Sequence, residues 1–236
     1  MLIHGLQKMT LLDFPGRVAC TVFLGGCDFR CPFCHNSDLL DMNAEPLMDD
    51  EELLAFLKTR KGLLDGVAFT GGEPLLRPDL PELFRRIRDL GFAVKLDTNG
   101  TSPDRLAALI GEGLVDYVAM DVKNSRERYA ATVGRDRLGD SFADSMERIE
   151  KSIALLLDGR VPYEFRTTVV REFHDDASFI GIAEMIRGAE HYFLQCFTDR
   201  DSVLQSGLNS PSREEMERWA DIVRPYVKDV QIRGMD

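Results

Sequence analysis

The chain is poor in positive charge, in cysteine and in long hydrophobic stretches. No apolar run approaches the roughly 18 residues of a membrane span, so we expect no membrane partner. The 29 Lys and Arg residues are outnumbered by 40 Asp and Glu residues, and a net charge of −11 argues against nucleic acid as the main partner. Five cysteines are an odd number and nothing resembles a secretory signal, which disfavours a disulfide framework and favours a reducing, cytoplasmic location.

The chain also lacks internal repeats, low-complexity segments and any Pro/Gly/Ser linker long enough to divide it. Of its 236 residues 44% are hydrophobic, which is enough to bury one full core. We therefore expect a single domain over residues 1–236.

Strand-like and helical patterns alternate along the sequence. The predicted strands are 18–24, 66–70, 93–97, 115–121, 163–170, 191–197 and 229–232, and the predicted helices between them are 49–59, 79–90, 102–111, 142–157, 175–187 and 212–224. This alternation predicts an α/β fold with parallel strands. Six strand–helix repeats are too few for a closed barrel of eight strands and about 250 residues. We predict a partial (β/α)6 barrel of the TIM type, with a flat doubly wound sheet as the alternative.

Three of the five cysteines fall within eight residues, directly after the first predicted strand. Cys27, Cys31 and Cys34 have the spacing C-x3-C-x2-C, and thiolates gathered this closely select zinc, copper(I) or an iron–sulfur cluster. A cubane 4Fe–4S cluster has four irons, and no fourth cysteine lies nearby to bind the last one. Because an open metal position is where a small molecule binds, the spacing predicts a reactive 4Fe–4S cluster.

Two other interpretations of these cysteines stay open at this point. A zinc site would take His35 as its fourth ligand, although zinc sites usually draw two pairs of ligands from separate elements. The thiols could also carry no metal. Cys20 and Cys196 each lie in an apolar, strand-like run, where a buried and inert thiol is the usual interpretation.

Polar residues recur where the predicted strands end. They are Gly71, Gly72 and Glu73 after the second strand, Asp97 and Thr98 after the third, Asp121 and Lys123 after the fourth, Arg166 on the fifth and Gln195 on the sixth. Active sites of α/β folds lie beyond the carboxyl ends of the parallel strands, so we expect these residues to share one site with the cysteines. Each also has a plain structural interpretation as a turn, a cap, an ion pair or a hydrogen-bonding filler.

The residue types indicate a ligand. Gly71 and Gly72 carry no Cβ, so backbone groups there can approach a ligand closely. Glu73 would lie beside an ammonium group of that ligand, and Phe33 would stack on a base. The two aspartates on neighbouring strands would bind ribose hydroxyls or a cation, and the lysine after the fourth strand would pair with a carboxylate. The expected ligand is a nucleoside that carries an amino acid, with one end on the open iron.

The order of these motifs resembles that of the radical S-adenosylmethionine (SAM) enzymes over nearly the whole chain. The cysteine motif, with its aromatic residue before the last cysteine, and the Gly-Gly-Glu-Pro sequence at 71–74 carry the resemblance. Within that superfamily, Cys34-His35-Asn36 and Leu-Asp-Phe-Pro-Gly at 12–16 resemble the activating enzymes of glycyl-radical enzymes. The nearest resemblance is to the activating proteins of anaerobic ribonucleoside-triphosphate reductase, and the pyruvate formate-lyase activating enzymes look like close relatives.

The resemblance implies an anaerobic oxidoreductase with one 4Fe–4S cluster on Cys27, Cys31 and Cys34, and with SAM on the fourth iron. A donor such as flavodoxin or ferredoxin would supply one electron to cleave SAM, and the 5′-deoxyadenosyl radical would remove a hydrogen from a glycine of the partner protein. The implied cofactor-binding residues are Phe33, His35, Gly71, Gly72, Glu73, Asp97, Asp121, Lys123, Arg166 and Gln195.

Two further points come from the same resemblance, and two alternative functions stay open. In one close relative the residues matching Asp97, Thr98 and Asp121 are associated with a monovalent cation, and we carry that site over as an expectation. The relative has a histidine at the end of the sixth strand where this chain has Gln195, which leaves the contact to the cofactor there open. Two alternative functions are a SAM enzyme that acts on a small molecule, similar to 7-carboxy-7-deazaguanine synthase, and a non-catalytic zinc-binding interaction module.

Overall fold

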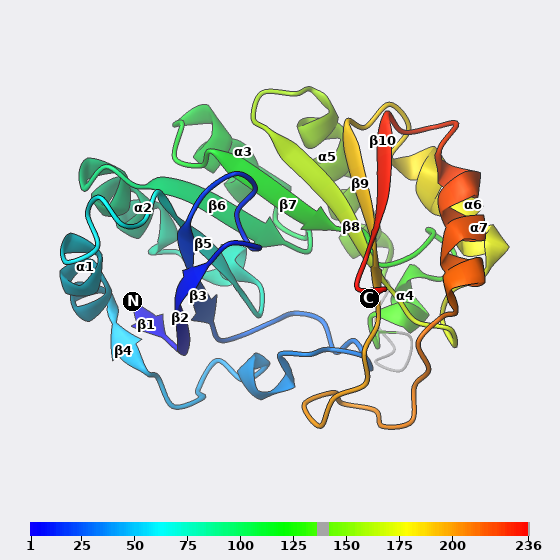
Figure 1. Cartoon of the computed structure of the whole chain (residues 1–236), viewed down its shortest axis with the longest axis horizontal. Helices are drawn as coiled ribbons and strands as arrows, with labels where there is room; N and C mark the ends of the chain where they lie inside the picture. The colour runs from blue at the N-terminus through cyan, green and yellow to red at the C-terminus, as the bar shows by residue number, and fades with distance from the viewer. Residues whose placement is uncertain (136–141, 236) are drawn as a thin grey trace.

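The computed structural model describes residues 1–135 and 142–235, and its centre is one curved sheet of eight strands (Figure 1). From edge to edge the strands run β10, β9, β8, β7, β6, β5, β3 and β2. Their bounds are β2 (Gly5–Thr10), β3 (Ala19–Leu24), β5 (Gly66–Gly71), β6 (Ala93–Thr98), β7 (Tyr117–Asp121), β8 (Tyr163–Val169), β9 (His191–Cys196) and β10 (Asp229–Arg233). All neighbouring strands are parallel except β2 and β3.

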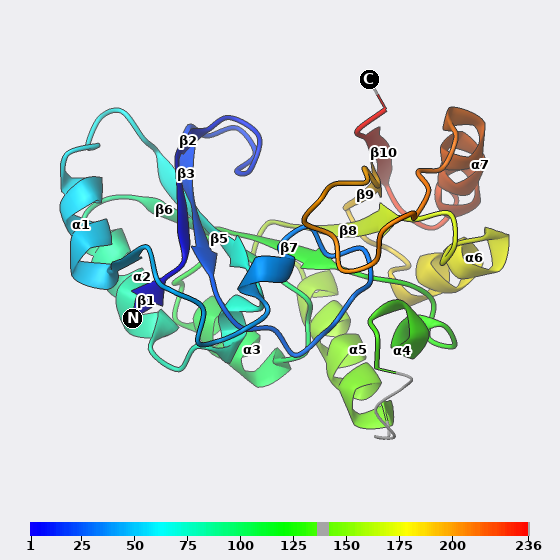
Figure 2. The same ribbon diagram turned by 90° about the horizontal axis from the view of Figure 1, so that it is seen from below.

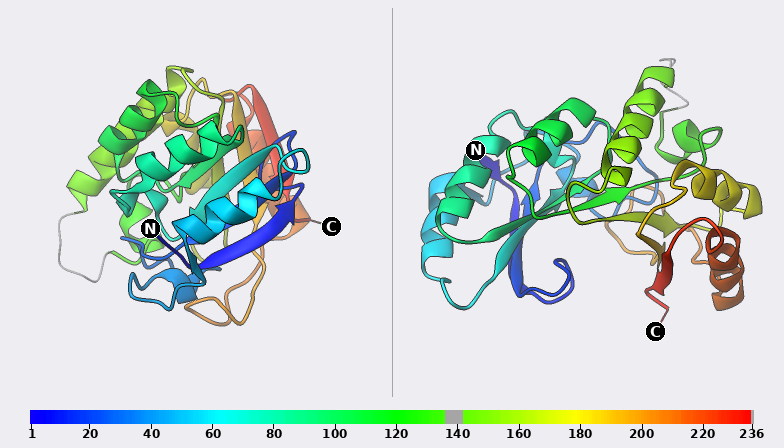
Figure 3. Two further views of the ribbon diagram at one scale, coloured as in Figure 1. Left: turned by 90° about the vertical axis from the view of Figure 1, so that its left-hand side faces the viewer. Right: turned by 90° about the horizontal axis from the view of Figure 1, so that it is seen from above.

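Helices connect the parallel strands. They are α1 (Asp50–Lys58), α2 (Leu80–Asp89), α3 (Pro103–Gly111), α4 (Tyr129–Thr132), α5 (Ala143–Leu157), α6 (Asp176–Met185) and α7 (Arg213–Val223), with short 3-10 turns η1 (Ser37–Leu39) and η2 (Pro74–Leu76). Figure 2 and the right-hand view of Figure 3 show the sheet as an arch with the helices on its outer side. The predicted α/β fold with a partial barrel of parallel strands is therefore confirmed.

Local sequence signals place the ends of these helices. Asp49 accepts a hydrogen bond from the backbone of Glu52 at 2.9 Å, and the Glu52 carboxylate accepts one from the backbone of Asp49 at 2.9 Å. Ser212 and Glu215 form the same capping box at the start of α7. Such reciprocal caps satisfy amide donors that have no partner inside the helix, which explains why each helix begins where it does.

Two parts of the fold do not follow from the alternation of strands and helices. The first is β2, an edge strand with an exposed centre that pairs with β3 through an irregular register between Gln7 and Thr10. The second is a short antiparallel pair of β1 (Leu2–Ile3) with β4 (Met48–Asp49). Both lie beside the strand that leads into the cysteine loop. In the parts of the chain that the structure describes, no helix has both the length and the hydropathy to cross a bilayer.

Candidate functional site

A cavity opens where the parallel strands end, and it gathers most of the residues that the sequence indicated. Its lining includes Cys27, Cys31, Phe33, Cys34, His35, Gly71, Gly72, Glu73, Asp97, Thr98, Asp121 and Lys123. These side chains come from the loop after β3 and from the ends of β5, β6 and β7. The carboxyl ends of parallel strands meet at one edge of a sheet, so the cysteines and the carboxylates of Glu73, Asp97 and Asp121 line the same cavity.

The three cysteines of the motif are free thiols. Cys31 is buried, and Cys27 and Cys34 are half-buried. Burial raises the pKa of the Cys27 and Cys31 thiols to about 12, so both are protonated in the chain without metal. A bound metal reverses that preference, because a coordinating thiol loses its proton. The three thiols thus line one cavity as soft donors of the kind that an iron–sulfur cluster takes.

The structure does not bring His35 to the cysteines as a zinc ligand. Its Nε2 lies 2.8 Å from the backbone oxygen of Thr198, and its ring stacks on Phe197 with centroids 5.4 Å apart. Over residues 1–135 and 142–235, no three His, Cys, Asp or Glu side chains converge on the position of one metal ion. The His35 ring therefore fastens the cysteine loop to the segment after β9.

Hydrogen bonds to three other segments hold the cysteine loop. The amide of Arg30 donates to the carbonyl of Val133 at 3.0 Å, and the amide of Gln205 donates to the carbonyl of Pro32 at 2.9 Å. The Asn36 side chain donates to the carbonyl of Gly71 at 3.1 Å. Figure 1 shows the loops after β3 and β9 side by side at the lower edge of the view. The cysteines are thus positioned by segments far apart in the sequence.

The packing of the chain itself requires the two glycines of the Gly-Gly-Glu turn. A Cβ on Gly72 would lie 2.0 Å from the carbonyl oxygen of Gly26, and a Cβ on Gly71, whose φ is +112°, would lie 2.5 Å from that of Leu24. The amides of Gly72 and Glu73 donate to those same two carbonyls at 2.8 Å. We expected glycine here so that a ligand could approach the backbone. The structure adds a nearer cause, which is the contact with the start of the cysteine loop.

Glu73 is a buried carboxylate held by uncharged donors. Its Oε1 accepts hydrogen bonds from the Thr98 hydroxyl at 2.8 Å and the Leu75 amide at 3.0 Å, and its Oε2 accepts one from the Asn99 amide at 2.6 Å. Burial nevertheless raises the pKa of Glu73 to about 8. A carboxylate offers about four acceptor positions, so one position on Oε2 is left for the donor of a ligand.

Asp97 on β6 and Asp121 on β7 reach the cavity from neighbouring strands, and Lys123 lies just beyond β7. Arg166 on β8 joins the two carboxylates, with Nη1 at 3.2 Å from Asp97 and Nε at 2.9 Å from Asp121. It lies behind the lining rather than in it. Phe33 is 3% exposed and packs on Phe173 with ring centroids 5.7 Å apart. Its ring is therefore part of the wall.

Gln195 does not reach this cavity. It lines a second and larger hollow of about 1190 Å³ on the inner face of the sheet, which it shares with Lys95, Arg166 and Arg233. Its register partner on β8, Thr168, lies at the cysteine cavity instead. The structure therefore places Gln195 among the residues of the second hollow and not among those that line the cysteine cavity.

The lining contains residues that sequence reasoning did not select. They are Phe29, Asn36, Thr70, Asn99 and Thr168. The Asn99 side chain donates to Asp28 of the cysteine loop at 2.8 Å, although Thr-Asn-Gly resembles an ordinary turn. Lys95 was also missed, and it is 2% exposed beneath the cavity. The available signal was a lysine in the middle of a predicted strand, two residues before Asp97.

Comparison with known proteins identifies relatives that match the whole chain or part of it. The model of the radical SAM superfamily matches residues 21–180. A Methanocaldococcus jannaschii protein, named as a candidate glycyl-radical enzyme activating enzyme, is 31% identical over 243 residues and covers 100% of this chain and 97% of its own length. The pyruvate formate-lyase-activating enzyme of Clostridium pasteurianum is 32% identical over 154 residues, which cover 62% of this chain and 63% of that enzyme.

A solved structure gives the same fold. SuiB of Streptococcus suis bound to S-adenosylmethionine has a TM-score of 0.67 at 11% identity, and the match covers 91% of this chain and 52% of SuiB. The sequence match extends over more than half of the chain and includes all three motif cysteines and the Gly-Gly-Glu turn. The chain is therefore a radical SAM enzyme and belongs to the radical SAM superfamily.

Proposed function

We propose that this chain activates a glycyl-radical enzyme, and that the partner is an anaerobic ribonucleoside-triphosphate reductase. One observation carries the proposal. A single cavity presents three free cysteines together with a buried carboxylate that has a spare acceptor position. The full-length relative named as a candidate glycyl-radical enzyme activating enzyme supports the choice of a protein as substrate.

The donor set fits the groups that the superfamily implies. Cys27, Cys31 and Cys34 would hold a 4Fe–4S cluster through three thiolates, which leaves one iron for SAM. Glu73 would accept the ammonium group of SAM at its remaining Oε2 position, and Lys123 would attract the carboxylate. When bound, the cluster and SAM supply the reductive cleavage that starts the reaction.

The surroundings of the cavity suit chemistry that must exclude water. Phe29 and Phe33 are each 3% exposed, and their rings pack against Tyr129 and Phe173. The second hollow, lined by the inner face of the sheet, gives a loop of another protein a place beside the cavity. Its volume of about 1190 Å³ is larger than a pocket for a drug-sized ligand requires, which favours a peptide loop as the substrate.

The test is an anaerobic incubation of the reconstituted chain with SAM, dithionite and a candidate reductase, followed by electron paramagnetic resonance. We expect a glycyl radical signal on the reductase that requires both SAM and this chain. A reductase in which the radical-bearing glycine is replaced by alanine is the control, and it should stay silent. Cleavage of SAM that modifies only a small molecule, with every candidate partner silent, would show the activase assignment to be wrong.

A further inference from the structure

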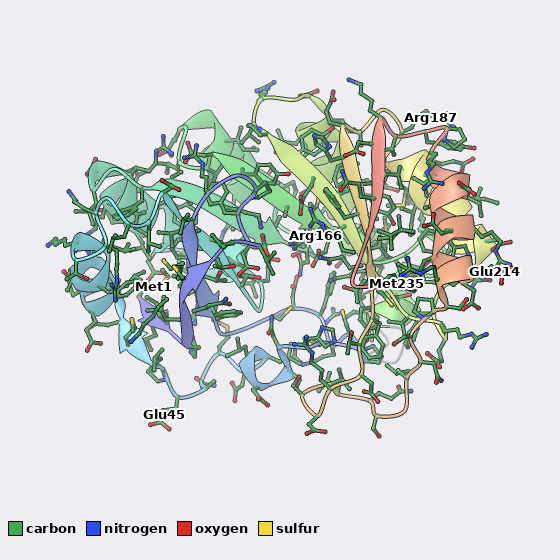
Figure 4. The ribbon with its side chains drawn as sticks, viewed as in Figure 1. Met1, Glu45, Arg166, Arg187, Glu214 and Met235 are labelled. Carbon is green, nitrogen blue, oxygen red and sulfur yellow. The ribbon has the colours of Figure 1, made fainter. Side chains whose placement is uncertain are left out.

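Five charged side chains form one continuous chain of ion pairs beneath the cysteine cavity. In order they are Lys95, Asp97, Arg166, Asp121 and Lys123. Lys95 Nζ contacts Asp97 Oδ1, Arg166 bridges Asp97 Oδ2 at 3.2 Å and Asp121 Oδ1 at 2.9 Å, and Lys123 Nζ lies 2.8 Å from Asp121 Oδ2. Figure 4 shows Arg166, its middle member, near the centre of the molecule. Both oxygens of both carboxylates thus accept from protein nitrogens.

These are also the residues at which we expected a monovalent cation. The third expected ligand, the Thr98 hydroxyl, donates to Glu73 at 2.8 Å and accepts from the amide of Gly100 at 3.1 Å. A sodium or potassium ion would have to displace protein donors from these oxygens. The residues present therefore do not fit the ion.

The charge of the group leads to the same conclusion. The three cations and two carboxylates of this chain carry a net charge of +1, and the exposed fraction of their side chains runs from 2% to 25%. The nearby Glu164 is itself paired with Arg233 at 3.2 Å. A further cation would raise the charge of this enclosed group to +2, at a steep cost in desolvation and repulsion. Burial acts to raise the pKa of Asp97, but Arg166 and Lys95 outweigh it and hold that pKa below its usual value. Both carboxylates are therefore ionised and fully compensated.

We propose that the Lys95 ammonium is a built-in replacement for the monovalent cation, so that this chain binds neither sodium nor potassium at Asp97. Lys95 is the member whose removal would reopen the site. Arg166 serves both carboxylates and Lys123 serves Asp121, whereas Lys95 serves Asp97 Oδ1. Without Lys95, two cations would face two carboxylates, and Asp97 Oδ1 would be free to bind an ion. The inference goes beyond the proposed function because it holds for any substrate of this cavity.

The test compares the chain with Lys95→Met, which has a similar volume and no charge, in sodium, potassium or choline chloride at one ionic strength. Choline is too large for the site. We expect the native chain to melt at the same temperature in all three salts. We expect Lys95→Met to melt roughly 10 °C lower in choline chloride, since it leaves a buried carboxylate oxygen unpaired. Sodium or potassium at ten times its dissociation constant should return about 4 °C of that loss.

Two further measurements keep the proposal testable should Lys95→Met fold poorly. Lys95→Arg keeps the charge and should show no preference among the three salts. The sodium-23 resonance should be broadened by Lys95→Met in a way that potassium relieves, and not by the native chain. A saturable gain in melting temperature of the native chain in sodium or potassium over choline would overturn the proposal. None of these readouts needs a radical product, so failure of the activase assay leaves this inference untouched.

Discussion

The two walls of the cavity differ in whether their buried ionisable groups have partners of opposite charge. The cysteine wall, which consists of the three motif cysteines and Glu73, carries two thiols and a carboxyl whose pKa values burial has raised. The second wall is formed by Asp97, Asp121 and Lys123, with Arg166 and Lys95 behind them. The two carboxylates of this ion-pair chain are fully paired and have lowered pKa values, although burial opposes that shift. Burial without compensation marks a wall that is ready for a cofactor, whereas burial with compensation marks one that is already complete.

The largest effect should come from removing a thiol of the cysteine wall. Cys31→Ala takes away one of three ligands from a loop in which Cys31 is buried and has no substitute nearby. We expect reconstituted iron to fall from about four atoms per chain to near zero, and SAM cleavage to fall with it. Iron analysis, the visible absorbance of the cluster and the yield of 5′-deoxyadenosine are the measurements.

Cys196→Ser is the matched control for that loss. Cys196 is half-buried on β9 and lies outside the lining of the cavity, so its replacement should leave the iron content at the native level. Full cluster content in Cys31→Ala would show that the motif does not supply the ligands. The contrast between the two walls would then lose its basis.

The next largest effect should come from a substitution that disturbs the backbone beside the cysteine wall without changing a thiol or a carboxyl group. Gly72→Ala places a methyl group 2.0 Å from the carbonyl oxygen of Gly26, which forces the two segments apart. We expect a loss of about 3 kcal/mol in the free energy of unfolding, or roughly 10 °C in melting temperature for a chain of this size. Thermal denaturation of the chain before reconstitution measures it.

Gly111→Ala is the control for a glycine that has room. Gly111 ends α3, and a Cβ there would meet nothing within 4 Å. The substitution should leave the melting temperature unchanged or raise it slightly, since alanine loses less conformational entropy on folding. Equal melting temperatures for the two alanine variants would show that the close approach of Gly72 to Gly26 is not a structural requirement.

The same contrast explains what the sequence could reveal. The residues of the cysteine wall could be predicted because they form short sequence motifs. Three thiols lie within eight residues, and a Gly-Gly-Glu turn directly follows a strand. The parallel strands could be predicted as well, since the alternation of short apolar runs with amphipathic helices is a strong signal. Parallel strand ends share one edge, which is why the expected residues converge on one cavity.

The ion-pair chain could not be predicted from the sequence, because the pairs of Arg166 with Asp97 and Asp121 join residues on different strands that are far apart in the sequence. Lys95 and Asp97 lie on the same predicted strand, and only the order of β6, β7 and β8 in the sheet shows that the two side chains pair and that Arg166 completes the set. Gln195 illustrates the same limit. The sequence predicted that Gln195 lies at the end of a strand, but it could not predict which cavity the residue would line. In the structure Gln195 lines the second hollow.

The smallest effect is a pH dependence that isolates Glu73. Its pKa is about 8 in the folded chain and 4.5 as the usual value, so ionisation is harder in the folded state. The folded chain therefore holds a proton that the unfolded chain loses, and this contribution to stability is complete below pH 4.5 and fades as the pH rises to 8. The native melting temperature should fall by about 3 °C per pH unit in that window, relative to Glu73→Gln.

The comparison with Glu73→Gln removes other titrations from the result. Burial lowers the pKa of His174, which favours folding as the pH rises, but this group is common to both proteins and cancels in the difference. The cofactor-free chains should be measured from pH 5 to pH 8. If the melting temperatures of the native chain and of Glu73→Gln change with pH in the same way over that range, then Glu73 is ionised throughout, as Asp97 and Asp121 are. The two walls of the cavity would then not differ in their electrostatics, and Glu73 would need no incoming ammonium group to compensate it.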